Sequence, residues 1–251
     1  MRWCRYSQEG EVRWGRVDGE EVIPFSGAPW CDDARPEGGP IPLNAVQLEV
    51  PAEPTKIVAV GRNYRAHAAE LGNAVPSEPL LFLKPPSSLL RPEGGIALPP
   101  ESGRVEFEGE LALVVGRRCR RIAPSEVAEC LAGLTCFVDV TARDLQRQDV
   151  QFTRGKGFDT FAPCGPWLVS DLDPGDLRLV TRVNGEVRQD ARTSEMVHSP
   201  LDLVSYISGI MTLEPGDLIV TGTPAGVGPL KSGDSVTVTI EGIGSLENTV
   251  L

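Results

Sequence analysis

The chain has 251 residues, of which 41% are hydrophobic and 24% charged, and its formal net charge is −11. This length and composition predict a globular protein with one large domain, or with a large and a small one. Because nucleic-acid binders usually present a basic face, the acidic balance argues against a nucleic-acid partner. The N-terminus has no apolar signal segment, and no stretch approaches the roughly 18 apolar residues of a spanning helix. We therefore expect a cytoplasmic protein without a membrane partner.

The first fifty residues predict a small N-terminal domain. Residues 1 to about 25 have the alternating pattern of β-hairpins, with turn pairs at Glu9-Gly10 and Asp18-Gly19. Residues 26–55 are rich in proline and glycine, which is typical of connecting structure. We place the boundary near residue 50, so that residues 1–50 form the small domain and residues 51–251 the main one.

The main domain is predicted to consist largely of strands. Short apolar or alternating runs predict strands at 56–60, 80–83, 106–115, 134–140, 166–169, 177–183, 218–221 and 235–240. Helices are predicted at 64–71, 124–131 and 199–211. Because the helices are few and do not alternate regularly with the strands, the pattern does not fit a doubly wound α/β fold. It favours a mixed β fold, a β-rich α+β sandwich or roll with few peripheral helices.

Three glutamates, Glu106, Glu108 and Glu110, alternate along one predicted strand and so share one of its faces. Alternation alone fits a solvated edge strand better than a binding site. However, the strand continues into the apolar run 111–115, and a second apolar strand ends in Asp139. Carboxylates that converge at the mouth of a buried strand suit a hard cation such as Mg²⁺, Mn²⁺ or Ca²⁺. Glu108, Glu110 and Asp139 would leave further coordination positions open to water and substrate.

His67 and Glu70 stand three residues apart on a predicted helix and therefore share a face. A carboxylate beside an imidazole fixes its tautomer, which suits a general base or proton shuttle. Taken alone, such a pair is more often a solvated helix face. The other histidine, His198, has no carboxylate at helical spacing and is interpreted as structural. Two histidines are too few for a three-histidine zinc site.

Lysine is scarce, and two of the four lysines, Lys84 and Lys156, lie in apolar or glycine-rich segments. Glycines on both sides of Lys156 would let backbone approach a ligand, so this lysine could anchor a carboxylate or stabilise an enolate. An ordinary loop lysine explains the same pattern. Thr223 lies in a glycine-flanked turn that offers a hydroxyl and backbone N–H groups to an anion, and a purely structural turn is the alternative.

Several short motifs, in order along residues 56–251, resemble the fumarylacetoacetate hydrolase superfamily. They are Gly61-Arg62-Asn63-Tyr64 with His67 and Glu70; Phe82-Leu83-Lys84-Pro85; Glu108-Gly109-Glu110-Leu111 through Gly116; Asp139-Val140-Thr141-Ala142-Arg143-Asp144; Lys156-Gly157-Phe158-Asp159; Gly222-Thr223-Pro224-Ala225-Gly226-Val227-Gly228; and Glu241-Gly242-Ile243-Gly244 with Leu246 and Asn248. The resemblance implies a β-roll main domain, a small N-terminal domain and a homodimer.

The resemblance also implies site residues. Glu108, Glu110 and Asp139 would hold Mg²⁺ or a similar ion, which leaves Glu106 outside the ligand set. His67 and Glu70 match a proton-transfer dyad on a helix that acts as a lid in relatives. Positions expected to face the substrate are Arg143, Gln146, Lys156, Thr223 and Lys84. The spacing from Asp139 to Lys156 is shorter than in some relatives.

The expected function is metal-dependent chemistry on a small 2-oxo or enol dicarboxylic acid. The first choice is 2-hydroxyhepta-2,4-diene-1,7-dioate isomerase, with or without 5-oxopent-3-ene-1,2,5-tricarboxylate decarboxylase activity, in aromatic-acid catabolism. An acylpyruvate hydrolase or an oxaloacetate decarboxylase is the alternative, because all three reactions pass through an enolate that a cation stabilises. A different class, a non-enzymatic binding module stabilised by metal, would have no use for the His67–Glu70 pair.

Overall fold

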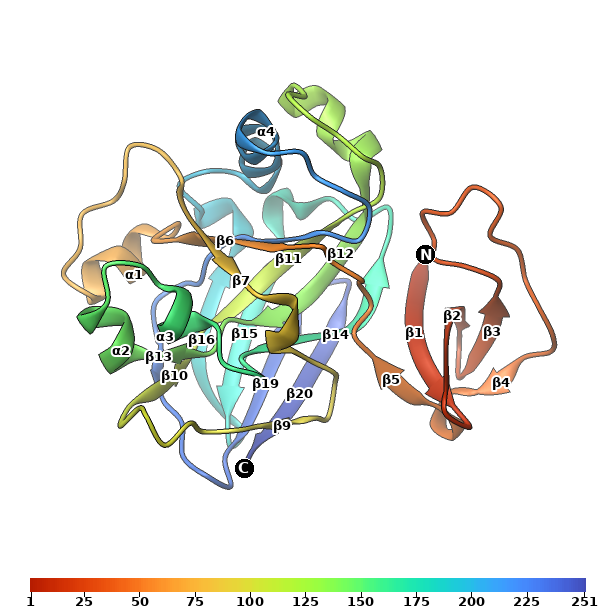
Figure 1. Cartoon of the computed structure of the whole chain (residues 1–251), viewed down its shortest axis with the longest axis horizontal. Coiled ribbons are helices and arrows are strands. Elements are labelled where there is room, and N and C mark those ends of the chain that lie inside the picture. Colours follow the sequence, from red (N-terminus) through yellow and green to blue (C-terminus); the bar gives the residue numbers. More distant parts are fainter.

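The computed structural model describes all residues, 1–251, and has a main body of packed β-sheets with a smaller β unit beside it (Figure 1). The small unit contains the first five strands: β1 (Arg2–Gln8), β2 (Glu11–Asp18), β3 (Glu21–Phe25), β4 (Ile41–Pro42) and β5 (Gln47–Glu49). It has a small core of its own around Cys4, Tyr6 and Val22. The unit also continues the main sheet, because β1 pairs with β14 at Arg2 and Trp3. The domain boundary near residue 50 therefore stays a proposal.

The central sheet of the main body runs β14-β12-β11-β17-β6-β7. Its strands are β6 (Ile57–Gly61), β7 (Leu80–Lys84), β11 (Gly109–Val115), β12 (Leu131–Val138), β14 (Ala162–Val169) and β17 (Leu218–Val220), with β8 (Leu89–Leu90) beside β14. β11 pairs antiparallel with both β12 and β17, and β17 pairs parallel with β6. As a result, the start of β11 and the ends of β12, β17 and β6 lie side by side along one edge of the sheet, the edge that is formed by strand ends and not by an outer strand.

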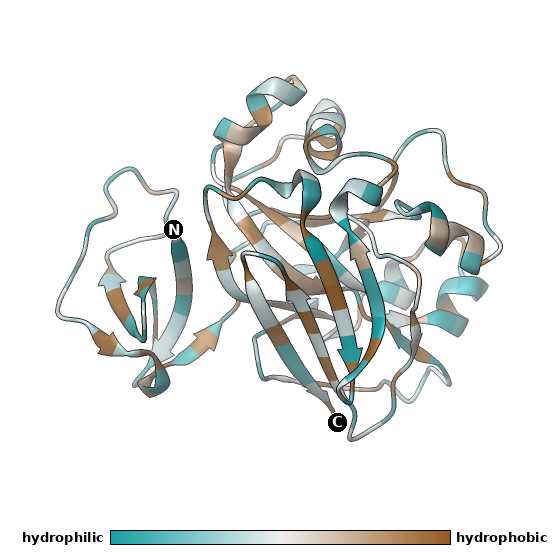
Figure 2. Cartoon of the chain, turned by 180° about the vertical axis from the view of Figure 1, so that it is seen from behind, coloured by the Kyte–Doolittle hydropathy of each residue, from teal (hydrophilic) through white to brown (hydrophobic).

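A second sheet packs against the central one. It has the order β16-β15-β19-β20-β9, with bounds β9 (Gly95–Ile96), β15 (Arg178–Val183), β16 (Glu186–Arg192), β19 (Ser235–Ile240) and β20 (Gly244–Val250). The largest core cluster fills the space between the sheets, with Leu111 and Leu113 of β11 among the same buried residues as Val236 and Val238 of β19. Figure 2 shows the alternation of polar and apolar residues along these strands that this packing requires.

The expected strand 106–115 is two strands. β10 (Val105–Phe107) belongs to a small third sheet with β13 (Thr141–Ala142) and β18 (Gly228–Pro229), whereas β11 begins at Gly109 in the central sheet. The chain changes sheets at Glu108. A residue without a side chain is needed just after the change, because a Cβ on Gly109 would lie 2.0 Å from the Thr181 hydroxyl oxygen of β15. The break places Glu108 at the edge of the central sheet.

Helices are few, as expected: α1 (Arg65–Glu70), α2 (Arg143–Gln148), α3 (Thr153–Lys156) and α4 (Pro200–Ile210). The expected helix 124–131 is a 3₁₀ helix that spans Pro124–Cys130. Leu131, the last residue of the expected helix, already belongs to β12. Further 3₁₀ turns are Leu43–Ala45, Pro86–Ser88, Pro174–Asp176 and Thr193–Glu195. None of the helices has both the length and the apolar character that crossing a bilayer requires. The strand-rich fold confirms the mixed β prediction.

Candidate active site

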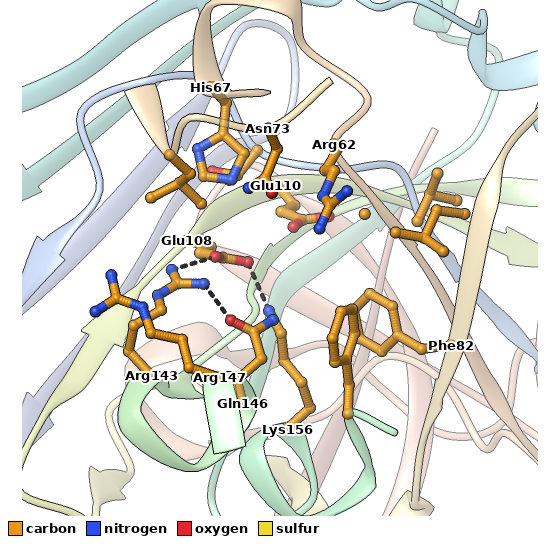
Figure 3. A pocket seen from close by; sticks show the side chains of 16 residues that line it. Arg62, His67, Asn73, Phe82, Glu108, Glu110, Arg143, Gln146, Arg147 and Lys156 are labelled. Carbon is orange, nitrogen blue, oxygen red and sulfur yellow. Dashed lines mark hydrogen bonds and ion pairs between the residues drawn. The ribbon is translucent and has the colours of Figure 1, made fainter. Parts of the chain in front are cut away.

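A cavity of about 340 Å³ opens at the edge of the central sheet where β11 begins (Figure 3). The helix α1 and the residues after it form one side of this cavity, and α2 and α3 form another. The lining residues are Val60, Gly61, Arg62, His67, Leu71, Asn73, Leu80, Phe82, Glu108, Glu110, Arg143, Gln146, Arg147, Phe152, Lys156 and Thr223. Acidic and basic side chains therefore face the same cavity.

Three carboxylates converge at this edge. One oxygen from each of Glu108, Glu110 and Asp139 lies within 4.8 Å of the others, and all three residues are buried. The strand register explains the convergence: Gly109 pairs with Val138, so Asp139 lies opposite Glu108, and the Asp139 N–H donates to the Glu108 carbonyl at 2.8 Å. Glu110 accepts a hydrogen bond from the backbone N–H of Gly222, just beyond β17.

Two buried ammonium groups compensate these carboxylates. Lys156 Nζ donates to Glu108 at 2.6 Å and to Asp139 at 2.5 Å, and it lies 5.1 Å from the centre of the Phe82 ring. Lys84 Nζ donates to the other oxygen of Asp139 at 2.7 Å. Both oxygens of Asp139 are thus occupied by lysines. Although burial lowers the pKa of Lys156, the charges of Asp139 and Glu108 outweigh this and raise it, so the ammonium stays charged.

The two glutamates of the cluster differ in charge balance. Burial alone would raise the pKa of Glu108, but the charges of Lys156 and Arg143 hold it well below its usual range. Burial raises the pKa of Glu110, and the nearby carboxylates of Asp139 and Glu108 raise it further. Glu110 therefore has no full partner for its negative charge among the protein's own side chains.

His67 lies on α1 above these carboxylates. Its side chain is buried and lines the cavity, and its Nδ1 faces Glu70 Oε2 at 3.4 Å. Glu70 is held from its other side by the backbone N–H of Gly226, which lies 3.1 and 3.2 Å from the two carboxylate oxygens. An anchored acceptor at Nδ1 leaves Nε2 of the imidazole to act toward the cavity.

Arg143, at the start of α2, ties the acidic segment together. Its Nε donates to Glu106 at 2.7 Å, one terminal nitrogen donates to Glu108 at 2.5 Å, and the other donates to Gln146 at 2.6 Å. The second oxygen of Glu106 accepts from Arg104 at 2.6 Å. Glu106 is therefore neutralised by two arginines and lies outside the converging trio.

Thr223 also lines the cavity, but its hydroxyl is occupied. It donates to the Gly109 carbonyl at 2.9 Å and accepts from Gln189 Nε2 at 2.7 Å. The Gln189 amide also donates to the Pro224 carbonyl at 2.8 Å and accepts from the Gly109 N–H at 3.0 Å. This buried amide therefore joins the residue between the two glutamates to the loop after β17.

Comparison with known proteins identifies the relatives of this chain. The family described as fumarylacetoacetate (FAA) hydrolase C-terminal matches residues 56–251, and the family described as Rv2993c-like, N-terminal, matches residues 1–51. The chain belongs to the fumarylacetoacetate hydrolase family.

Three relatives illustrate the range of similarity. Protein Rv2993c of Mycobacterium tuberculosis is 46% identical over 260 residues and is aligned over 100% of this chain and 98% of its own length. A crystal structure of 2-hydroxyhepta-2,4-diene-1,7-dioate isomerase from Mycobacterium marinum is 43% identical, with a TM-score of 0.93 over 100% of this chain and 98% of that one. Oxaloacetate tautomerase FAHD1, mitochondrial, of Arabidopsis thaliana is 46% identical over 199 residues, which cover 77% of this chain and 89% of that protein.

The donor set of this family member fits a divalent cation. Hard cations take carboxylate oxygens, and three of them converge here within a buried pocket. Burial and the neighbouring carboxylates raise the pKa of Glu110, so a cation would favour its charged form. The Lys156 ammonium between Glu108 and Asp139 marks a point where positive charge is stabilised. Glu108, Glu110 and Asp139 could therefore hold the ion.

Two of the residues expected to face the substrate are arranged differently. Lys84 does not line the cavity: its side chain is fully buried beneath the site, where it donates to Asp139 and to the Lys156 carbonyl at 2.5 Å. It supports a carboxylate instead of contacting a ligand. Thr223 does line the cavity, but its hydroxyl proton goes to Gly109, so this hydroxyl can offer a ligand only an acceptor lone pair.

Several residues that line this cavity had no role predicted from the sequence. Arg62, Asn73 and Arg147 line the cavity, and so does an edge-to-face pair of rings, Phe82 and Phe152, with centroids 5.5 Å apart. Arg62 and Phe82 stand within recognisable motifs, so their position in a motif was the available signal. The other three are in segments without periodicity, where no pattern marks a side chain as facing a cavity.

Proposed function

We propose that this protein is a divalent-metal-dependent isomerase of small 2-oxo dicarboxylic acids and their enols. The observation that carries the proposal is one buried histidine, paired with a carboxylate, beside three converging carboxylates. The preferred substrate type is 2-hydroxyhepta-2,4-diene-1,7-dioate, because a solved relative bearing that isomerase name aligns with the whole chain. The tautomerase name of another relative also describes an isomerisation of a dicarboxylate.

The proposed cation is Mg²⁺, held by Glu108, Glu110 and Asp139. When bound, it supplies electrostatic stabilisation for the negative charge of an enolate. His67 Nε2 accepts the proton from the carbon beside the 2-oxo group, and the electrons of the broken C–H bond form the enol double bond. The same nitrogen returns the proton at another position of the conjugated system, so the substrate is isomerised without loss of atoms.

The other side chains of the site position the reactants. Glu70 accepts the Nδ1 proton of His67 and so keeps Nε2 in the basic form that the first step needs. Arg143 holds Glu108 in place, and Gln146 is oriented by the same guanidinium toward the cavity. Lys156, which remains charged, is proposed to share its ammonium with an oxygen anion of the substrate.

Exchange of substrate protons with D₂O tests this function directly. We expect the protein with Mg²⁺ to accelerate deuterium incorporation beside the keto group of oxaloacetate or a longer 2-oxo diacid, as measured by NMR, and EDTA to abolish the effect. His67→Gln should reduce the rate by about 10²–10⁴-fold, the usual contribution of a general base. His198→Gln is the matched control, since the chain has only these two histidines.

Two results would contradict the proposal: exchange that survives chelation, or an unchanged rate in His67→Gln. Including an acylpyruvate in the panel separates isomerisation from C–C hydrolysis, because only hydrolysis releases two products. The homodimer expected from the resemblance stays a prediction, which light scattering on the purified protein tests.

A further inference from the structure

Arg62 is a cavity-lining arginine without a protein partner. It directly follows β6 and its side chain points into the cavity toward the region of Glu110 (Figure 3). No hydrogen bond or ion pair involves its guanidinium, although it is only partly exposed. A cation that is half-withdrawn from water and has no anion is costly, and it suits a site where a ligand brings the anion.

The backbone holds Arg62 in this direction. Its φ is +59°, in the left-handed region that non-glycine residues seldom adopt. The next residue, Asn63, is fixed by side-chain bonds to the carbonyls of His198 at 3.0 Å and Thr221 at 2.8 Å, and by the His198 N–H at 2.9 Å. The unfavourable conformation is therefore imposed by the surrounding structure, as is common where a side chain must be aimed at a ligand.

The other arginines of the cavity are differently placed. Arg143 donates hydrogen bonds to Glu106, Glu108 and Gln146. Arg147 lies further along α2 and is exposed to solvent, which screens its charge. Arg62 is thus the cavity's partly buried guanidinium whose donors are all free.

The cavity wall beside Arg62 is partly apolar. Val60 and Leu80, at the adjoining ends of β6 and β7, line the cavity beside Arg62, and the edge-to-face rings of Phe82 and Phe152 line it too. A ligand that reaches from the cluster to Arg62 would pass a carbon chain along these side chains.

The charge balance favours more than one negative group on that ligand. The hydrogen-bonded cluster has four carboxylates, Glu106, Glu108, Glu110 and Asp139, against four cations, Lys84, Arg104, Arg143 and Lys156. A divalent cation would add two positive charges to this balanced cluster, and the carboxylate of a 2-oxo acid would neutralise one of them. Arg62 adds a further positive charge, and a second carboxylate at the other end of the ligand would offset it.

From these observations we infer that Arg62 is a specificity-determining residue that binds the second, distal carboxylate of a 2-oxo dicarboxylic acid. A planar guanidinium can donate hydrogen bonds to both oxygens of a carboxylate at once, which also selects the length and direction of the ligand. The inference rests on the proposed function, because it assumes that the first carboxylate and the keto oxygen lie at the Glu108–Glu110–Asp139 cluster.

Binding to the Mg²⁺-loaded protein, measured by calorimetry, tests the inference. Two matched pairs of ligands differ only in the distal carboxylate: 2-oxoglutarate against 2-oxopentanoate, and 2-oxoadipate against 2-oxohexanoate. We expect the wild type to prefer one or both diacids over the matched monoacids by about 10–100-fold, the usual effect of a charge-assisted hydrogen-bonded pair. Arg62→Gly should remove this preference, because it should lower the affinity for the diacid and leave the affinity for the monoacid unchanged.

Glycine is the informative replacement because it adopts the positive φ of position 62 without strain, so the variant should fold at least as stably as the wild type. Arg62→Lys should retain part of the preference, since it keeps the charge but not the planar fork. Arg65→Ala is the matched control: Arg65 is exposed on α1, does not line the cavity and should leave the preference intact.

Oxalate tests the cation site separately from Arg62, because it can chelate a cation but has no distal group. If oxalate requires Mg²⁺ for binding and binds Arg62→Gly as tightly as wild type, the cluster end of the site behaves as proposed. Equal affinity for diacids and monoacids in the wild type overturns the role of Arg62 alone. The same holds if Arg147→Ala, and not Arg62→Gly, abolishes the preference. Magnesium-independent binding of oxalate contradicts the proposed function instead.

Discussion

Glu70 and Gly226 are joined by a side-chain to backbone contact, since both carboxylate oxygens of Glu70 lie within 3.2 Å of the Gly226 nitrogen. Gly226 belongs to the loop after β17, whereas Glu70 ends α1. The contact therefore links the helix that bears His67 to the loop that bears Thr223. This contact restricts the rotamers of Glu70 and so helps to orient the dyad.

Gly226→Ala should break this link. The Gly226 φ is +106°, and a Cβ at this position would lie 1.9 Å from the Arg188 carbonyl oxygen, so the loop has to move. We expect a lower rate of substrate proton exchange together with a loss of stability. Gly233→Ala is the matched control, because its φ of +89° imposes similar strain, about 1–2 kcal/mol, without any atom within 4 Å of the new Cβ. Equal losses of exchange rate in both variants would show that the Gly226 contact does not orient the dyad.

Gln189→Leu should destabilise the backbone that carries Glu108 and Glu110. The Gln189 amide is the partner of the Gly109 N–H and of the Pro224 carbonyl, and each buried polar group left unpaired costs about 1–3 kcal/mol. Since Gly109 stands between Glu108 and Glu110, we also expect weaker Mg²⁺ binding, measured by calorimetry alongside urea unfolding. Gln148→Leu, at an exposed position of α2, should change neither quantity. A destabilised Gln189→Leu variant with unchanged Mg²⁺ affinity would limit Gln189 to a structural role.

Much of the fold follows from the sequence because its strands are short apolar or alternating runs. The helices 64–71 and 199–211 were predicted within a residue or two of α1 and α4, and Ser199 caps α4 by accepting the Asp202 N–H at 3.2 Å. The strands β16 and β20 were missed. Both alternate buried and exposed positions, but the charged or polar residues on their outer faces and their weak apolar content obscured the period.

The site was less accessible to sequence reasoning. Alternation put Glu106 and Glu108 together, but it could not reveal that the chain changes sheets at Glu108, since that change depends on which strands pair. It likewise could not show that Lys84 lies beneath Asp139, because a buried lysine and a ligand-facing lysine have the same local pattern. The helix α2 is almost entirely polar and has no hydrophobic period, so its position beside the cavity is set by tertiary contacts with Glu106 and Glu108.

The cysteines should differ sharply in reactivity. All six are free, and Cys31 is exposed. Burial raises the pKa of Cys4 and of Cys136 to about 12, and it raises that of Cys164 further, so these thiols stay protonated at pH 8. Brief treatment with iodoacetamide at pH 8, followed by peptide mass spectrometry, should label Cys31 and leave these three unmodified. Early labelling of any of the three would mean that the core opens on the timescale of the reaction.

Lys84→Met tests whether Asp139 belongs to the metal site. Lys84 is completely buried, its pKa is lowered by burial in spite of the Asp139 charge, and removing it leaves Asp139 with Lys156 as its one cation. Breaking a buried ion pair costs about 3–5 kcal/mol, and we expect a loss of that order in urea unfolding without metal. Lys231→Met, at an exposed position, should have little effect.

Added Mg²⁺ should recover part of the stability lost in Lys84→Met, because a cation at the cluster would neutralise the Asp139 carboxylate that the lysine no longer serves. By linkage, the increase in unfolding free energy that saturating Mg²⁺ produces should then be larger in Lys84→Met than in the wild type. The lost bonds to the Val140 and Lys156 carbonyls are not replaced by the cation, so recovery should be incomplete. An equal Mg²⁺ increment in both proteins would indicate that Asp139 is not a ligand, and the ion would then have to be held by Glu108 and Glu110 without it.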